Sequence, residues 1–370
     1  MTSSGSEVVI VGGGICGCLA AYLLARAGVP VIVIERGGIG EQASGCNSGT
    51  LGPLLGAGVP GPLGDMAMAA FRIHQALLDD WGPERPGSFR SLSRLHVSAG
   101  EDQAPHLTRI FDQYSRHQGF SAEYLNGAEL ARLEPRLNPR FAFAVATHGD
   151  LAVDGREYTL AIAAKARQAG AVFAHHEVKG FDHAGDRVTA VRCNGRVVSC
   201  GALVIAAGPW SAALARPLGC DIPSKPVKGE MLRFASPSPR YDISHNGMSC
   251  YGRGNQEAWA GSTNEDAGFD LSLTRVARER IGDAAADLLP DLKDAKLESQ
   301  TAALRDASVD GVPVCGRIPG WENGYVMAGA GSKGLLLSAL MSRTVQELIT
   351  RGSAPSVAGP ADPGRFSLAS

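Results

Sequence analysis

Residues 8–35 read VVIVGGGICGCLAAYLLARAGVPVIVIE, and this stretch decides the fold. The apolar run at 8–11 is long enough for a buried parallel strand, and a second apolar run at 31–34 stops at Glu35. A helical pattern over residues 19–27 lies between the two runs. The order strand, glycines, helix, strand and acid predicts a β-α-β unit that binds a dinucleotide.

Each glycine of the G-x-G-x-x-G pattern has a separate role in such a unit. Gly12 allows a tight turn, Gly14 lets the backbone approach a pyrophosphate, and Gly17 lets the helix pack closely on the strand. The start of the helix, with Ile15 and Cys16, presents backbone N–H groups and a positive dipole end to the phosphates. The pattern therefore predicts where the phosphates bind.

The segment after the second strand is expected to hold the rest of the nucleotide. Glu35 lies where a carboxylate accepts hydrogen bonds from ribose hydroxyls, and Arg36 follows it. A glycine-rich turn in an ordinary β-α-β unit would not explain this acid. The loop over residues 37–58 is rich in glycine and small polar residues, which suit a polar, planar ligand. Its candidate contacts are Ser44, Gly45, Asn47, Ser48 and Gly49.

The composition is that of a globular protein with little net charge. The chain has 370 residues, a formal net charge of −2, 44% hydrophobic residues and 19% charged residues. This balance gives no general attraction to nucleic acid or to anionic membranes. We expect no membrane span and no secretory signal, because long apolar runs and a basic leader are missing. The eight scattered cysteines favour reduced thiols in the cytoplasm over a metal site.

Signals for nucleotide binding recur further along the chain. Asn194-Gly195 marks the turn of a hairpin over residues 187–198, and small residues end a buried strand at 202–208. A strand, a glycine-rich turn and a helix follow one another over residues 323–349. The turn provides a second helix start beside glycines, more than 300 residues from the first.

The stretches between these signals have a different character. Residues 226–234 and 247–263 indicate strands of a second, antiparallel sheet. The tail after Gly352 is rich in Pro, Ala, Gly and Ser and is expected to be a loose terminal segment. Two interleaved domains therefore explain the chain better than two sequential ones.

Together these motifs resemble the D-amino-acid oxidase superfamily of FAD enzymes, which includes glycine oxidase and sarcosine oxidase. The resemblance covers nearly the whole chain and is strongest to the glycine oxidase branch. Beyond residues 9–36 it rests on ASGCNSG at 43–49, IAAGPWS at 205–211, PVKGEML at 226–232, GSTNEDAGFD at 261–270, LR at 304–305 with DGVPVCG at 310–316, and GAGSKGLL at 329–336.

The resemblance implies an α/β fold in which a Rossmann-like FAD-binding domain is interleaved with an α+β substrate domain built on an antiparallel sheet. We expect the FAD-binding domain to comprise residues 1–80, 150–215 and 305–370, and the substrate domain to comprise residues 81–149 and 216–304.

The resemblance further implies oxidation of the C–N bond of a small amino acid or secondary amine. Hydride would pass to flavin N5, water would hydrolyse the imine to an oxo acid, and oxygen would reoxidise the flavin with release of peroxide. The alternative is an FAD-dependent dehydrogenase of an amino acid or a 2-hydroxy acid that passes electrons to a quinone or a partner protein. A non-catalytic FAD-bearing subunit is a third interpretation.

Roles for individual residues also follow from the resemblance. Arg305 would hold the substrate carboxylate with two parallel hydrogen bonds, and the competing interpretation is a salt bridge between domains. Tyr251 and Arg253 lie two apart on a strand of the substrate sheet and would share its substrate-facing side. The FAD would also be contacted by Val178, Ala207, Gly208, Trp210, Gly331, Ser332, Lys333, Gly334 and Leu335.

Two departures from sarcosine oxidases affect the chemistry that we expect. Those enzymes tether their flavin through a cysteine where this chain has Ala303, so we expect FAD to be bound non-covalently, with Cys46 an ordinary thiol. Their oxygen-activating lysine has no evident counterpart around Trp259, so the acceptor is either molecular oxygen or another electron acceptor. The oligomeric state stays open, with a homo-oligomer among the expectations.

Overall fold

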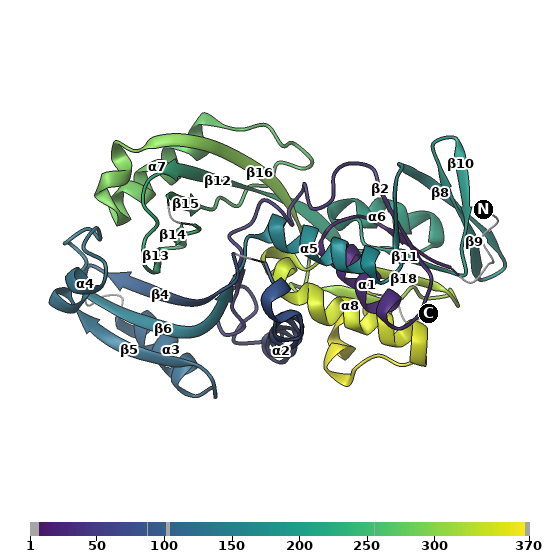
Figure 1. Ribbon diagram of the computed structural model, residues 1–370, viewed down its shortest axis with the longest axis horizontal. Helices are drawn as coiled ribbons and strands as arrows, with labels where there is room; N and C mark the ends of the chain where they lie inside the picture. Colours follow the sequence, from purple (N-terminus) through teal and green to yellow (C-terminus); the bar gives the residue numbers. More distant parts are fainter. Residues whose placement is uncertain (1–6, 87, 101–103, 255, 367–370) are drawn as a thin grey trace.

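The computed structural model describes residues 7–86, 88–100, 104–254 and 256–366. The two larger β-sheets lie side by side along the long axis of the molecule, the nine-stranded sheet in the left half of Figure 1 and the six-stranded sheet in the right half. Both described ends of the chain lie at the end that holds the six-stranded sheet (Figure 1). The α/β fold that the sequence predicts is confirmed.

The first sheet is the dinucleotide-binding type that residues 8–35 predict. Its strands are parallel except β17, and β1 lies between β2 and β11 with all four of its residues buried. Strands that are covered on both faces need apolar residues throughout, which explains the unbroken valine and isoleucine runs. In spatial order the strands are β17 (Val314–Arg317), β18 (Gly324–Ala328), β11 (Ala202–Ile205), β1 (Val8–Val11), β2 (Val31–Glu35) and β7 (Val172–His175).

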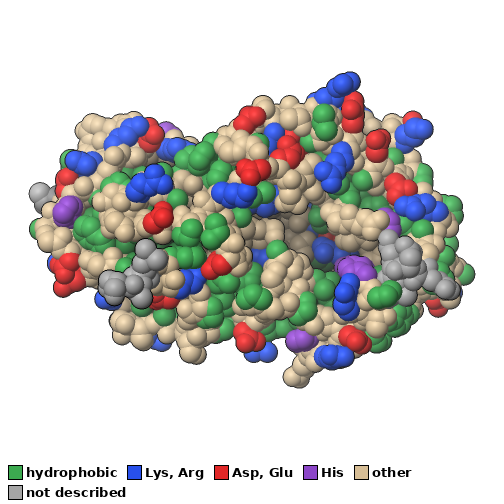
Figure 2. All heavy atoms as spheres, turned by 180° about the vertical axis from the view of Figure 1, so that it is seen from behind, with side chains coloured by type: hydrophobic (Ala, Val, Ile, Leu, Met, Phe, Trp, Pro, Cys, Tyr) green, Lys and Arg blue, Asp and Glu red, His purple; other side chains and the backbone are tan. Residues whose placement is uncertain are grey.

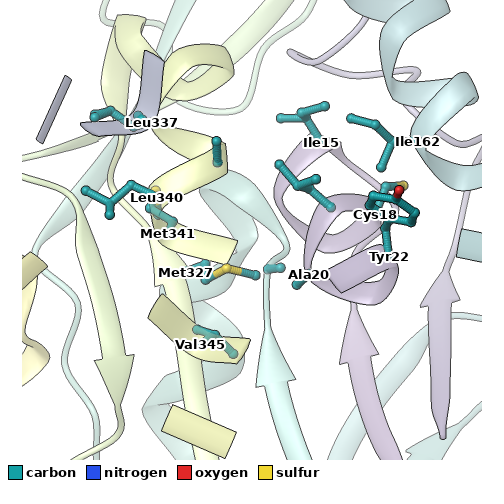
Figure 3. Close-up of a cluster of buried hydrophobic side chains, with 14 of the residues drawn as sticks. Ile15, Cys18, Ala20, Tyr22, Ile162, Met327, Leu337, Leu340, Met341 and Val345 are labelled. Atoms are coloured by element: carbon teal, nitrogen blue, oxygen red, sulfur yellow. The ribbon is translucent and has the colours of Figure 1, made fainter. Parts of the chain in front are cut away.

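Helices cover one face of this sheet. Helix α1 packs between α5 and α8, and α2 packs on the outer side of α8. Figure 3 shows part of the buried cluster, with Ile15 of α1 between Leu340 of α8 and Ile162 of α5, and Tyr22 of α1 below Ile162. The helices are α1 (Ile15–Arg26), α2 (Gly64–Trp81), α5 (Gly155–Gln168) and α8 (Gly334–Arg351).

A small sheet and a short helix cover the other face. A second core cluster joins Val9 and Leu203 of the six-stranded sheet to Val191 of the hairpin predicted around Asn194. The elements are β8 (Val178–Ala184), β9 (Arg187–Cys193), β10 (Arg196–Ser199) and α6 (Ser211–Ala215).

The second sheet has nine strands and is antiparallel except where β4 runs parallel to β13. Its order is β16 (Lys296–Ser308), β12 (Ser224–Ala235), β15 (Glu257–Gly261), β14 (Met248–Gly252), β13 (Asp242–His245), β4 (Arg90–Ser98), β6 (Phe143–Ala152) and β3 (Thr50–Leu51), and β5 (Ser121–Asn126) also pairs with β6. The accompanying helices are α3 (Ala104–Ser115), α4 (Gly127–Leu133) and α7 (Arg275–Leu288).

The two faces of the nine-stranded sheet differ in polarity, because side chains alternate along each strand. Leu232 and Ala260 pack against Ile281 of α7 in a third core cluster. The opposite face carries Tyr251, Trp259 and Arg233, which the register places side by side on three neighbouring strands. This polar face is the one that the substrate prediction requires.

The strand assignments show how the two halves interleave. Every strand of the six-stranded sheet falls in one of the three stretches predicted for the FAD-binding domain. β6 and β16 run across the predicted limits at 150 and 305, and β3 lies inside the first stretch although it pairs with β6. Strand pairing in β6 and β16 continues across these limits. The division into domains stays a prediction.

The tail corrects one expectation. Residues 353–366 are packed rather than loose, with Ala358 and Ala361 buried and Arg365 paired with Asp310 at 2.9 Å. The tail forms two short 3-10 helices, η7 (Ser356–Ala361) and η8 (Pro363–Phe366). The 3-10 helices elsewhere in the described chain are η1 (Gly82–Glu84), η3 (Gly208–Trp210), η4 (Arg216–Leu218), η5 (Pro290–Lys293) and η6 (Gly331–Lys333).

In the described part of the chain, no helix combines the length and apolarity that a membrane crossing requires.

Gly17 provides a direct test of the packing between α1 and β1. A Cβ atom there would lie 2.0 Å from the carbonyl oxygen of Gly12, so Gly17→Ala forces the helix away from the glycine turn. We expect the substitution to lower the free energy of unfolding by about 2 kcal/mol, as overpacking does. Urea denaturation followed by circular dichroism measures this change.

Gly282→Ala in α7 is the matched control. No atom lies within 4 Å of a Cβ placed there, so alanine should leave stability unchanged or raise it by up to about 1 kcal/mol. Equal stability of the Gly17 variant and the wild type would show that the close approach is not needed.

Candidate active site

A cavity of about 560 Å³ lies where the two halves meet. Its wall includes Val11, Ile34 and Ala206 at the carboxyl ends of parallel strands, and Tyr251 and Arg305 from the nine-stranded sheet. The carboxyl edge of an open parallel sheet is where α/β proteins bind nucleotides. Seen from behind, the surface is hollowed near the middle of the molecule, and charges of both signs alternate across this face (Figure 2).

The glycine turn brings backbone to the cavity. Gly12 has a φ of +116°, and a Cβ there would lie 2.3 Å from the carbonyl oxygen of Ala206. Only glycine satisfies both constraints. A Cβ at Gly14 would meet only the hydroxyl of Ser44, at 3.2 Å, so this backbone is open toward the cavity that it lines. The turn and the start of α1 therefore form a cradle of the kind that a pyrophosphate needs.

Glu35 is held rigidly at the edge of this cradle. Its Oε2 accepts a hydrogen bond from the Gly13 N–H at 2.6 Å, and its Oε1 accepts one from the Gly37 N–H at 2.7 Å. The carboxylate also lines the cavity. The remaining lone pairs fit the predicted role of an acceptor for ribose hydroxyls.

The loop over residues 43–50 closes on itself beside the start of α1. The Ile15 N–H donates to Ser44 Oγ at 2.9 Å, so one N–H that we expected to serve a phosphate already has a partner. Asn47 donates to the carbonyl oxygens of Ala43 and Ser44 and accepts from the Gly49 N–H at 2.7 Å. The side chain of Asn47 therefore shapes the loop, and it also lines the cavity.

Gly45 and Gly49 are needed for packing rather than for contact with the cavity. A Cβ at Gly45 would lie 2.3 Å from the carbonyl oxygen of Gly40, and one at Gly49 would lie 1.7 Å from that of Val153. Neither residue belongs to the cavity wall. Their predicted role as direct cofactor contacts is corrected to the support of a tight loop.

Arg305 extends from β16 into the cavity wall with its charge unpaired. One Nη donates to the carbonyl oxygen of Thr263 and to Asn264 Oδ1, both at 3.0 Å, and the other donates to Ser262 Oγ at 2.7 Å. No Asp or Glu of the described chain forms an ion pair with it, and burial lowers its pKa. Gly229 provides the space, because a Cβ there would lie 2.4 Å from the guanidinium.

Tyr251 and Arg253 do not share a role. Tyr251 lines the cavity, whereas Arg253 is buried outside its wall. Its guanidinium pairs with Asp242 at 2.8 Å and donates to the carbonyl oxygen of Ser48 at 2.7 Å. The prediction that Arg253 faces the substrate is corrected, because Asp242 neutralises this arginine and draws it into the core.

Lys333 is another correction. Its ammonium donates to the carbonyl oxygens of Gly52, at 2.7 Å, and Leu55, and it does not line the cavity. Burial lowers its pKa to about 8, while the nearby Asp150 opposes that shift. Lys333 therefore ties the start of α8 to the loop that begins after β3.

Aromatic rings close one end of the cavity. Trp210 stacks against the Arg36 guanidinium, whose central carbon lies 4.3 Å from the ring centre. The Trp210 ring also contacts Phe269, with 5.6 Å between the ring centroids.

Cys46 lines the cavity, and burial raises its pKa, which disfavours the reactive thiolate. The described residues contain no cluster of His, Cys, Asp and Glu that could hold a metal ion.

Most predicted site residues meet at this cavity. Its wall includes Gly12, Gly14, Ile15, Cys16, Glu35, Arg36, Ser44, Cys46, Asn47, Ser48, Val178, Ala207, Gly208, Trp210, Tyr251, Arg305, Gly331, Ser332, Gly334 and Leu335. The predicted residues outside the wall are Gly17, Gly45, Gly49, Arg253 and Lys333.

Sequence reasoning missed several wall residues of the nine-stranded sheet. Met231 and Ala303 share the face of Arg305, because Val227 pairs with Arg305 and Gly229 with Ala303. Every second residue of β12 and of β16 points to the same face of the sheet. These wall residues can therefore be read from the sequence once the register of the two strands is known. Asp306, which neighbours Arg305, was also missed.

The residues present fit an FAD molecule. The glycine cradle and Glu35 suit the adenosine diphosphate half, and the backbone of the turn at 329–331 lines the same cavity from the other side. Tyr251, Met231 and Arg305 of the nine-stranded sheet line the same cavity. The cavity volume of about 560 Å³ is within the range of ligand sites.

Comparison with known proteins agrees with this geometry. Residues 7–348 match the family model DAO, described as FAD dependent oxidoreductase. A glycine oxidase of Pseudomonas aeruginosa is 30% identical over 353 residues, which cover 93% of this chain and 94% of that protein. Hydrogen cyanide synthase subunit HcnC of Pseudomonas protegens is 29% identical over 98% of this chain and 97% of its own length.

A solved structure shows the same architecture. Glycine oxidase from Geobacillus kaustophilus superposes with a TM-score of 0.88 at 26% identity, covering 97% of this chain and 99% of that chain. Because the family match spans nearly the whole chain and the cavity has the features of a dinucleotide site, this chain belongs to the DAO family of FAD-dependent oxidoreductases.

Proposed function

We propose that this enzyme oxidises the C–N bond of a small amino acid or secondary amine that carries a carboxylate. The observation that carries the proposal is the partly buried guanidinium of Arg305, which lines the cavity without an acidic partner in the described chain. Partial burial of a cation without a counter-ion is unfavourable, and a ligand that supplies the opposite charge offsets that cost. A substrate carboxylate supplies that charge, and the two Nη atoms suit its two oxygens.

The orientation of Arg305 would set which bond of the substrate reacts. Bonds to Ser262, Thr263 and Asn264 fix the guanidinium before the substrate arrives, which lowers the entropic cost of alignment. Met231 and Tyr251 line the same region and would exclude water from the reacting carbon. Bound FAD supplies the chemistry, by accepting the hydride from the carbon that carries the nitrogen.

The glycine oxidases among the relatives support an amino-acid substrate with a small side chain.

We propose that molecular oxygen takes the electrons from the enzyme and is released as peroxide. A second candidate is a dehydrogenase of an amino acid or a 2-hydroxy acid that passes its electrons to a quinone or a partner protein. The likeness to a synthase subunit supports a role for a partner protein in this second candidate.

Removal of the Arg305 charge tests the carboxylate assignment. We expect Arg305→Leu to raise the apparent KM for an amino-acid substrate strongly, because loss of a buried charge pair costs roughly 2–5 kcal/mol. Steady-state kinetics on the FAD-loaded variant measures the effect. The visible flavin spectrum should stay unchanged, since Arg305 is assigned to the substrate.

Arg233→Leu is the matched control for this experiment. Arg233 lies on the polar face of the same sheet, stacks on Trp259 at 3.9 Å and is not part of the cavity wall. Its removal should leave KM within about twofold of the wild type, because Arg233 does not line the cavity and no substrate contact is assigned to it. Unchanged kinetics in the Arg305 variant would remove the assignment.

Anaerobic reduction of the flavin separates the candidate substrates. We expect the yellow colour to bleach with small amino acids or N-methyl amino acids, because both offer a carboxylate to Arg305 and a C–N bond for oxidation. A rapid-mixing absorbance screen that also contains 2-hydroxy acids gives the comparison. Bleaching by 2-hydroxy acids alone would refute the proposed reaction.

Readmission of air to the reduced enzyme then tests the acceptor. The oxidase proposal predicts that the colour returns within seconds, with about one peroxide formed per flavin. Slow recovery in air together with fast recovery on addition of a quinone would favour the dehydrogenase. No bleaching by any small substrate would point to a non-catalytic subunit.

A further inference from the structure

Asp306 is a buried acid in the cavity wall that the substrate assignment leaves without a role. It follows Arg305 on β16 and is 8% exposed. Its Oδ2 accepts a hydrogen bond from the Gly329 N–H at 2.6 Å, whereas its Oδ1 is buried and has no partner among the described residues. No Lys, Arg or His of the described chain forms an ion pair with it.

Such a carboxylate has an unmet need for a hydrogen-bond donor. Burial raises the pKa of Asp306, and the bonds from the Gly329 N–H and the Ser224 side chain only partly oppose this effect. A buried acceptor without a donor costs more than one that is paired, and charged acceptors gain most from a donor. The group that fills the cavity is the natural source of this donor.

The surroundings of Asp306 identify which part of FAD it meets. Burial is the main cause that raises the pKa of Cys16, and the negative charge of Asp306 is the second cause. Asp306 therefore lies near the start of α1, where the pyrophosphate is expected. Backbone bonds of Ser308 and Ala307 to the turn at 329–330 hold the strand against that turn. Arg305 leaves the same strand on the opposite face, toward the substrate.

Asp306 therefore lies between the phosphate cradle and the substrate region. The part of FAD that spans this interval is the ribityl chain, which joins the pyrophosphate to the isoalloxazine ring and carries three hydroxyl donors. We propose that Asp306 holds FAD by accepting a hydrogen bond from a ribityl hydroxyl. This role concerns the cofactor and does not depend on which substrate the enzyme oxidises.

Titration of the full-length apoprotein with FAD, followed by quenching of flavin fluorescence, tests the proposal without any substrate. We expect Asp306→Ala to raise the Kd for FAD by about tenfold or more, as loss of a bond to a charged group does. Asp306→Asn keeps the shape and the bond from Gly329 but lacks the charge, so its Kd should rise by a smaller factor. The Asn variant also secures the test if the Ala variant does not fold.

Ser308→Ala is the control. Ser308 is buried on the same face of β16, two residues away, but it does not line the cavity. Its Kd for FAD should stay within about twofold of the wild type, because no ligand contact is lost.

FAD analogues that lack one ribityl hydroxyl separate ligand contact from a structural role. The analogues are 2′-, 3′- and 4′-deoxyribityl FAD. For one of them, the Kd of the wild type should be about as high as the Kd of the Ala variant for FAD itself. The Ala or Asn substitution should cost little further affinity for that analogue. An equal loss for FAD and for all three analogues would overturn the proposal, as would an unchanged Kd in both Asp306 variants.

Discussion

The site depends on a partly buried positive charge that the protein does not neutralise. Arg305 is fixed by neutral acceptors on the loop that follows β15, and Gly229 leaves the space it occupies. That loop is itself anchored to β12, because the backbones of Lys228 and Glu265 exchange two hydrogen bonds of 2.9 Å and the Glu230 N–H donates to Thr263 Oγ1. The fold thus holds an unpaired cation in place, which favours an anionic ligand in the cavity.

Counter-ions explain why neighbouring cations have different roles. Arg253 meets Asp242 and turns into the core, and Lys333 donates to two backbone carbonyls. Both bind the loop between residues 48 and 55, so they shape the wall around the cavity. Arg305 differs from Lys333 in lining the cavity, and it differs from Arg253 in having no acid partner among the described residues. The ion pair with Asp242 therefore separates the structural Arg253 from the candidate ligand-binding Arg305.

The sequence predicts the cofactor half well because its signals are local. The glycines at 12, 14 and 17 and the acid at Glu35 lie within one β-α-β unit, and the structure brings Gly12, Gly14 and Glu35 to one cavity edge. The positions of Arg253 and Lys333 depend on partners some ten to nearly three hundred residues away, which no local pattern reveals. Asp306 escaped notice for the same reason, since its importance comes from a missing partner.

A crystal structure of the FAD-loaded enzyme with a small, non-oxidisable carboxylate tests the central claim most directly. The account predicts that both carboxylate oxygens lie within hydrogen-bond distance of the two Nη atoms of Arg305, with Ser262 and Asn264 still holding the guanidinium. A carboxylate bound elsewhere in the cavity, with Arg305 bonded only to its own loop, would contradict the claim.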